Sequence, residues 1–404
     1  MEPAPARGRG PARAAPHLDV DRLLGDRGTR IIVCCGAGGV GKTTTAAALA
    51  LRAAEQGRRV VVLTIDPARR LAQSLGVGLL DNTPRPVTGF TAADGGSLDA
   101  MMLDMKRTFD EVVLAHAVAD KAQQILANPF YQAVSSSFAG TQEYMAMEKL
   151  GQLVQQAGRD PATQWDLVVV DTPPSRSALD FLDAPKRLGS FLDGRFIRLL
   201  SAPARVGGRA YLKVLSAGAT VVSATLTRVL GGQLLSDVRT FVSALDTMFG
   251  GFRERADETY ALLKNGGTAF IVVAAPERDA LREASYFIDR LEQDGMPLGG
   301  LVVNRVQQLA APGLSAGRAL AAAEQLTEGG SNGGRRAGAR SAVTTAGLLR
   351  LHAELSEVAG RHRNLQRRFT AGHPGIPVAT VPVLAQDVHD LASLREVGLA
   401  LAGG

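Results

Sequence analysis

The residues with the clearest chemical potential lie in the run GAGGVGKTT, from Gly36 to Thr44. The run fits the G-x-x-x-x-G-K-[ST] phosphate-loop pattern, in which glycines let backbone N–H groups curl around phosphate oxygens at the start of a helix. The pattern predicts that Lys42 reaches the β- and γ-phosphates of ATP and that Thr43 ligates Mg²⁺. The predicted nucleotide-binding residues of the loop are Gly36, Gly38, Gly39, Val40, Gly41, Lys42, Thr43 and Thr44.

Two acidic residues end hydrophobic runs later in the chain: Asp66 closes RRVVVLTID and Asp171 closes DLVVVD. An acidic residue that ends a strand well after a phosphate loop is typical of the carboxylate that organises Mg²⁺, so we expect Asp171 to hold the metal through a water molecule. Asp66 is the candidate for positioning or deprotonating the water that attacks the γ-phosphate, with Lys42 as the second catalytic residue. The alternative for Asp66 is that it only caps a turn.

These residues need a parallel sheet to bring them together. A strand from Ile31, a helix over 42–56 that stops at Gly57, and a strand ending at Asp66 form a βαβ unit, and such units favour right-handed crossovers in parallel sheets. Asp66 then lies at the carboxyl edge of the sheet, beside the phosphate loop, where open α/β sheets bind ligands.

The rest of the chain continues this pattern, so the predicted fold class is α/β: a P-loop NTPase fold with a mostly parallel central sheet flanked by helices. Further strands are expected over 98–103, 165–170, 268–274, 298–303 and 376–381, and helices over 106–126, 142–156, 279–293 and 387–401. We expect a disordered tail over 1–28 and one domain over 29–404, with a helical insertion over about 105–160 and 180–262 and a mobile loop over about 327–345.

The composition is that of an ordinary globular protein, with 46% hydrophobic and 21% charged residues. A net charge of +6, from 45 basic and 39 acidic residues, is too small to predict nucleic-acid binding unless the charge is clustered. The chain has two cysteines, Cys34 and Cys35, which are adjacent in a strand and should point to opposite faces. This pattern excludes a disulfide framework and indicates a reducing compartment.

The amino-terminal 16 residues lack the apolar region of a signal peptide, and no run reaches the roughly 18 apolar residues of a spanning helix. We therefore expect a cytoplasmic protein, at most peripheral at a membrane. Residues 194–236 contain no acid but several arginines, with apolar residues at three- and four-residue steps from Leu212 to Val229. This span is either a helix packed on the core, or the wall of an apolar groove or a basic helix that faces a membrane.

Together these markers resemble the ArsA-like family of P-loop ATPases, which includes arsenite-pump ATPases and the guided-entry ATPases that target tail-anchored membrane proteins. The family's loop G-K-G-G-V-G-K-T matches Gly36 to Thr43 except at Ala37. Its first switch, D-P-A-H-x-L-x-D, matches at Asp66, Pro67, Ala68 and Leu71, whereas Arg69 and Gln73 differ. Its second switch, D-T-A-P-T-G, matches at Asp171, Thr172 and Pro174, whereas Pro173, Ser175 and Arg176 differ.

The resemblance also implies a role for two later positions: Asn304 as the residue that reads the adenine, and Pro382-Val383 as the loop that covers the base. It further implies a dimer that sandwiches ATP between two chains. In that arrangement the family's signature lysine crosses the interface to the partner's nucleotide, and Ala37 stands in its place here. A homodimer of this chain would lack that cation at both sites.

Three hypotheses follow from Ala37. The chain pairs with a paralogue that carries the lysine, so that its own site receives the missing charge. Alternatively, Arg69 supplies the cation in a homodimer, or the chain is a slow ATPase that mainly binds nucleotide as a regulatory subunit. A cation supplied in trans can raise phosphoryl transfer about 10³- to 10⁵-fold, so ATPase and size-exclusion measurements distinguish these hypotheses.

Two functions of different classes remain. The first is an ATP-driven switch that opens and closes a partly apolar helical surface around a hydrophobic protein client or a membrane surface. The second is a DNA-partition-type ATPase, which salt-sensitive DNA binding would reveal; the modest charge makes nucleic acid the less favoured partner. Arsenite transport is disfavoured because the family's metalloid site uses thiols, and the zinc-bridging cysteine pair of the guided-entry ATPases is missing too.

Overall fold

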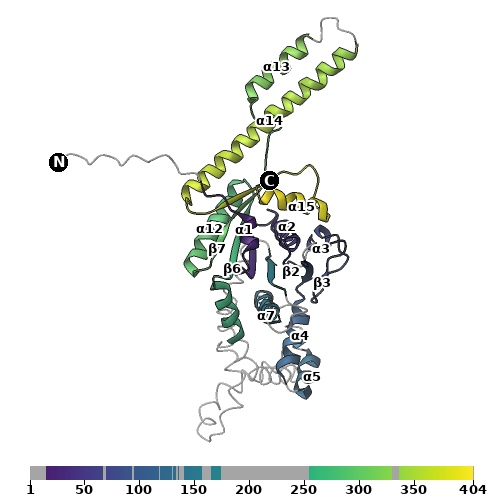
Figure 1. Ribbon diagram of the computed structural model, residues 1–404, viewed down its shortest axis with the longest axis vertical. Coiled ribbons are helices and arrows are strands. Elements are labelled where there is room, and N and C mark those ends of the chain that lie inside the picture. Colours follow the sequence, from purple (N-terminus) through teal and green to yellow (C-terminus); the bar gives the residue numbers. More distant parts are fainter. Residues whose placement is uncertain are drawn as a thin grey trace, which may run out of the picture.

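The computed structural model describes residues 15–66, 70–92, 95–117, 119–129, 131–132, 135, 141–156, 165–173, 254–329 and 336–403. Within these ranges an eight-stranded sheet runs through the molecule in the order β3-β4-β2-β5-β1-β6-β7-β8 (Figure 1). The strand pairs in this part of the chain are all parallel except that between β3 and β4. The strands are β1 (Ile31–Gly36), β2 (Arg59–Thr64), β3 (Arg85–Pro86), β4 (Ser97–Met102), β5 (Leu167–Asp171), β6 (Thr268–Ala274), β7 (Leu298–Val306) and β8 (Val378–Pro382). The predicted α/β fold with a mostly parallel sheet is confirmed.

The central strand β1 is buried on both faces, as its run of β-branched residues and cysteines predicts. It lies between β5 and β6, with Ile31 paired to Val168 on one side and to Thr268 on the other. The side chains of Cys34 and Cys35 belong to different hydrophobic clusters, one on each face of the sheet. Burial raises the pKa of the Cys35 thiol to about 12, so this side chain is an inert part of the core.

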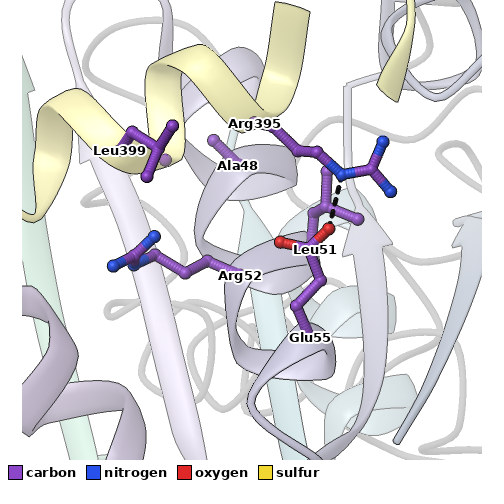
Figure 2. A pocket seen from close by; sticks show the side chains of 7 residues that line it. Ala48, Leu51, Arg52, Glu55, Arg395 and Leu399 are labelled. Carbon is purple, nitrogen blue, oxygen red and sulfur yellow. Dashed lines mark hydrogen bonds and ion pairs between the residues drawn. The ribbon is translucent and has the colours of Figure 1, made fainter. Parts of the chain in front are cut away.

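One face of the sheet is covered by α2 (Lys42–Glu55), together with α1 (Val20–Gly25), α3 (Arg70–Ser74) and α15 (Leu391–Leu401). α2 carries a run of alanines that are fully buried, which lets α15 pack closely on it. Figure 2 shows the shallow groove of about 110 Å³ between these two helices, where Arg395 points at Glu55 and its Nε donates at 2.6 Å.

The other face is covered by α12 (Arg278–Asp294) and by the helices α4 (Met105–His116), α5 (Ala119–Ala127) and α7 (Thr141–Gln156). α12 buries Ala284, Phe287, Ile288 and Leu291 on the stripe that faces the sheet. Met145 and Met147 of α7 are fully buried core residues. These three shorter helices fall in the first part of the predicted helical insertion; 174–253 lie outside the described residues, as does the acid-free span over 194–236.

Two helices between β7 and β8 form a hairpin that projects from the rest of the molecule (Figure 1). They are α13 (Ala316–Gly329) and α14 (Arg336–Gly372). The sequence predicts a mobile loop over about 327–345, and this is wrong for most of its length, because α13 continues to Gly329 and α14 begins at Arg336. The run GGSNGG suggested a loop, whereas the alanine-rich, arginine-rich residues after it favour a helix strongly.

The tail predicted over 1–28 is also partly wrong. The backbone of Leu18 donates to Val378 and that of Val378 donates to Pro16, which attaches the chain to the edge of β8. Helix α1 follows, with Asp19 as its N-cap and Val20 and Leu24 buried. Two apolar residues four positions apart are too few to predict a helix from the sequence. In the structure, α1 forms because Val20 and Leu24 pack on the core.

The amino edge of the sheet is held by one buried cation. Arg58 is 1% exposed and its Nε donates to Asp166 Oδ1 at 2.7 Å. Its two other nitrogens donate to the carbonyls of Leu24, Thr29 and Asp166 at 2.7–3.0 Å. The side chain therefore joins α1 to the first residues of β1, β2 and β5. Within the described ranges, no helix is both long enough and apolar enough to cross a bilayer.

Candidate functional site

The glycine loop connects the end of β1 to the start of α2, at the carboxyl edge of the sheet. Gly41 is the N-cap of α2 with φ of 95°, and a Cβ there would lie 2.2 Å from Asn304 Nδ2. Gly36 has φ of 147°, and a Cβ there would lie 2.1 Å from the carbonyl oxygen of Val273. Both positions therefore favour glycine, because each has a positive φ and little space for a Cβ, beside the backbone of Val273 at Gly36 and beside the side chain of Asn304 at Gly41.

Lys42 is the first residue of α2 and is 6% exposed. Its Nζ donates to the carbonyl oxygen of Ala37 at 2.8 Å, across the loop. Burial lowers the pKa of Lys42, whereas the negative charges of Asp171 and Asp66 raise it. The ammonium group is thus held inside the loop, where it donates to a neutral oxygen.

Asp171 ends β5 and is fully buried between β1 and β2. Its Oδ2 accepts from Thr43 Oγ1 at 2.8 Å and from Thr64 Oγ1 at 2.9 Å. Its Oδ1 has no hydrogen-bond partner among the atoms that the structure describes. Burial raises the pKa of Asp171 to about 6. The hydrogen bonds from the two threonines and the charge of Lys42 lower the pKa, but by less than burial raises it.

An orphaned buried carboxylate oxygen is costly, and such groups in native proteins often mark a ligand or ion. The hydroxyl of Thr43 and the carboxylate of Asp171 are hard oxygen donors, which suit Mg²⁺. The residues present therefore fit the predicted magnesium site.

Asp66 follows β2 at the same edge and is half-buried. Its backbone N–H donates to Thr64 Oγ1 at 3.2 Å, and its charge acts on both Lys42 and Asp171. The structure therefore brings Asp66 close to the loop and to the second carboxylate. Pro67 to Arg69 of the first switch and Pro174 to Arg176 of the second lie outside the described residues.

A groove of about 570 Å³ opens beside the loop, between the ends of β7 and β8 and α2. Gly41, Thr44, Asn304, Pro382 and Val383, all predicted from the sequence, line it. The other lining residues are Arg70, Gln73, Ser74, Arg305, Val381, Leu384, Gln386, Asp387, Val388 and Val397. The predicted adenine-binding residues thus lie together, next to the loop that would hold the phosphates.

Asn304 also holds the loop in place. Its Nδ2 donates to the carbonyl oxygen of Val40 at 2.9 Å, and its Oδ1 accepts from the backbone N–H of Arg305 at 2.9 Å. Arg305 has φ of 59°, which is uncommon outside glycine, asparagine and aspartate. The amide of Asn304 compensates for this strained backbone and ties β7 to the glycine loop.

Sequence reasoning missed Thr64 and the two arginines of the groove, Arg70 and Arg305. Thr64 ends the buried strand β2 with a hydroxyl aimed at Asp171. A polar residue just before Asp66, in an otherwise apolar strand, is the signal that could have found it. The sequence around Arg70 and Arg305 carries no such signal. These two residues are far apart in the chain, and only the order of the strands brings them to the same groove.

Comparison with known proteins agrees with this geometry. The model of the anion-transporting ATPase (ArsA ATPase) family matches residues 29–312, well over half of the chain. The chain belongs to this family.

ATPase GET3 of Malassezia globosa is 25% identical over 289 residues, 71% of this chain and 76% of the relative. ATPase ARSA2 of Chlamydomonas reinhardtii is 25% identical over 306 residues, 72% of each chain. ATPase BagA of Mycobacterium tuberculosis is 29% identical over 174 residues, 41% of this chain and 49% of the relative. As a member of the anion-transporting ATPase family, the chain is an ATPase that uses ATP. The family match ends at residue 312, before α13, α14 and β8.

Proposed function

We propose that this ATPase is a magnesium-dependent switch whose nucleotide state controls a helical surface for a client. One observation carries the nucleotide site: Lys42, Thr43, Thr64 and Asp171 meet at the carboxyl edge, with one carboxylate oxygen left without a partner among the described residues. The charged groups of Lys42 and Asp171 are therefore placed to bind a ligand rather than to form an ion pair with each other.

The glycine loop binds the phosphates through its backbone N–H groups, and Lys42 exchanges the carbonyl of Ala37 for the β- and γ-phosphate oxygens. Thr43 and Asp171 would hold Mg²⁺, with Asp171 acting through a water molecule. When bound, the metal neutralises charge that develops on the phosphates. The groove between β7 and β8 takes the base, with Asn304 at its floor and Pro382 and Val383 at its wall.

Asp66 acts on the attacking water. It lies at the end of β2, one strand away from β5, so its carboxylate reaches the space in front of the loop. There it orients the water in line with the γ-phosphate and accepts its proton.

Ala37 defines what the site lacks. Its side chain is a buried methyl group, 7% exposed, and supplies no positive charge to a facing nucleotide. Phosphoryl transfer depends on positioned positive charge. We therefore propose that this chain pairs with a paralogue that carries the signature lysine, which completes the site of this chain in trans.

The purified chain tests this proposal by light scattering after size exclusion, together with ATP turnover. We expect slow turnover from the chain alone and at least about a tenfold gain in the Ala37→Lys homodimer, because a cation supplied in trans is worth more than that. A fast wild-type homodimer with no gain from the substitution would contradict the proposal. Asp66→Asn is the control: it should bind ATP without turnover, and retained turnover would remove Asp66 from the mechanism.

A further inference from the structure

Thr64 is a buried residue that has no task in the phosphate-loop pattern or in the proposed mechanism. It ends β2 after four apolar residues and is 1% exposed. A valine at this position would have nearly the same shape and no polar atom to satisfy. A buried hydroxyl costs free energy unless it is hydrogen-bonded, so the partners of Thr64 indicate what it does.

The register of the sheet places Thr64 beside Asp171. The two residues are paired in the parallel strands β2 and β5, and the backbone N–H of Ile65 donates to the carbonyl oxygen of Asp171 at 2.9 Å. Side chains alternate between the faces of a sheet, so a shift of one residue in either strand would turn the hydroxyl to the opposite face. The contact between hydroxyl and carboxylate is therefore set by the strand register.

The hydrogen bonds of the Thr64 hydroxyl run in one direction. Its oxygen accepts from the backbone N–H of Asp66 at 3.2 Å, and its hydrogen is donated to Asp171 Oδ2 at 2.9 Å. The carbonyl oxygen of Asp66 lies 3.5 Å from the hydroxyl oxygen, too far to compete with a carboxylate at 2.9 Å. Because a hydroxyl has one hydrogen to donate, these contacts direct it at Asp171.

Two hydroxyl groups on the same oxygen fix the orientation of the Asp171 carboxylate. Oδ2 accepts from Thr64 on β2 and from Thr43 on α2, whereas Oδ1 has no partner among the described atoms. The last side-chain torsion of an aspartate has a broad distribution, so a carboxylate held less firmly can rotate. Thr43 is also the expected ligand of Mg²⁺, which leaves Thr64 as the donor whose hydroxyl serves Asp171 alone.

We propose that Thr64 is a positioning residue for magnesium: its hydroxyl holds Oδ2 of Asp171, so that Oδ1 is left to serve the metal. This inference rests on the proposed function, because it needs Mg²⁺ beside Thr43 and Asp171. Thr64 acts through Asp171. Residues that orient the ligands of a metal by hydrogen bonds change metal affinity by about 10- to 100-fold when they are removed.

Isothermal titration of the non-hydrolysable ATP analogue AMPPNP into the full chain, in Mg²⁺ and in EDTA, tests this proposal without turnover. The ratio of the two affinities measures what the metal contributes to binding. We expect Thr64→Val to reduce this ratio about tenfold and to leave the affinity in EDTA within about twofold of wild type. An unchanged ratio in Thr64→Val would overturn the proposal.

Two further substitutions separate the hydroxyl from the packing of the side chain. Thr64→Ser keeps the hydroxyl, so its ratio should stay close to that of wild type. Thr64→Ala removes the hydroxyl and packs differently from valine, and its ratio should fall as in Thr64→Val. A ratio that falls equally in the serine and valine variants would show that packing is the cause and would overturn the proposal.

Thr268→Val is the matched control. Thr268 begins β6 of the same sheet, is 3% exposed and donates from Oγ1 to the carbonyl oxygen of Leu262 at 2.9 Å. Both valine variants lose one buried hydrogen bond, so both should unfold at a lower urea concentration, but only Thr64→Val should change the ratio. A reduced ratio in Thr268→Val would show that general destabilisation is the cause and would overturn the proposal.

The same titrations separate this inference from the proposed function. If the wild-type affinity for AMPPNP did not depend on Mg²⁺, the metal site and the role of Thr64 would both be wrong. If wild type depended on Mg²⁺ and Thr64→Val kept the full dependence, the metal site would stand and the role of Thr64 alone would be overturned. Lys42→Met should weaken binding both in Mg²⁺ and in EDTA, because it removes a direct contact to phosphate.

Discussion

Buried charged groups are paired at the amino edge of the central sheet and incompletely paired at its carboxyl edge. At the amino edge, Arg58 donates to Asp166 and to several carbonyl groups, and Asp166 also accepts from Arg27 at 2.7 Å. At the carboxyl edge, Asp171 keeps one oxygen without a partner in the described part of the chain, and Lys42 donates to a neutral backbone carbonyl.

The difference indicates that the amino edge contributes to stability and that the carboxyl edge is the functional site. A buried charge that is fully paired contributes to holding its neighbours in place, whereas a buried polar atom without a partner costs free energy. The strained φ of Arg305 and the orphaned oxygen of Asp171 occur at the carboxyl edge. Strain and unpaired groups persist at sites where a ligand relieves them.

Removing the charge at the amino edge should have the largest effect on stability. We expect Arg58→Met to lower the free energy of unfolding by about 3 kcal/mol, because it takes one donor from the half-buried Asp166 carboxylate and leaves several carbonyl groups at this edge without their donor. Urea denaturation measures this. Arg27→Met is the control: Arg27 pairs with the same Asp166 but its side chain is 60% exposed, so its loss should cost at most about 1 kcal/mol. If both variants lost the same free energy of unfolding, burial of the arginine would not determine how much each pair contributes to stability.

The opposite result is expected at the carboxyl edge. Without nucleotide, Asp171→Asn should raise the free energy of unfolding by about 1 kcal/mol, because it removes a buried charge whose Oδ1 has no partner among the described atoms. The same substitution should abolish ATP turnover. Asp166→Asn, the matched change at the amino edge, should destabilise the protein because it weakens the pair with Arg58. A destabilised Asp171→Asn variant would contradict the contrast between the edges.

A smaller effect is expected where Asp21 of α1 meets Arg52 near the end of α2. The hydrogen bond from Arg52 lowers the pKa of Asp21. The folded pKa therefore lies below the unfolded value of about 3.9, so the pair stabilises the protein above that pH and loses its effect as the pH falls through the folded pKa. Because the Asp21 side chain is 44% exposed, screening limits the effect to about 0.5 kcal/mol.

Denaturation of wild type and Asp21→Asn at pH 7 and pH 3 checks this prediction. The difference between the two proteins should shrink at the lower pH. A difference that stays constant or grows would show that the carboxylate charge is not the cause.

The glycine loop and the two strand-end carboxylates were predictable because their signals are local. A glycine-rich turn between an apolar run and helix formers has one common structure. Asp171 ends β5 as its sequence suggests, and Asp66 lies two residues after the end of β2. The order of the strands depends on contacts between distant segments. The sequence alone therefore did not reveal that Thr64 faces Asp171 or that Arg70 and Arg305 share a groove.

The hairpin and α1 show a second limit. The glycine-rich run before Arg336 predicts a loop, although many of the residues that flank it favour a helix. Helix α1 is six residues long and is stabilised by packing on α2 rather than by its own sequence. Arg58 lies in the basic start of a strand, and nothing in the sequence distinguishes its buried side chain from that of the neighbouring Arg59.

The central claim is that the carboxyl edge binds Mg²⁺ and ATP through Lys42 and Asp171. Isothermal titration of ATP with Mg²⁺ into wild type and Lys42→Met tests it most directly. We predict that the substitution weakens binding at least about tenfold, through loss of a charge-assisted contact to phosphate, and leaves the free energy of unfolding unchanged or higher. Equal affinity of the two proteins for ATP in the presence of Mg²⁺ would contradict the account.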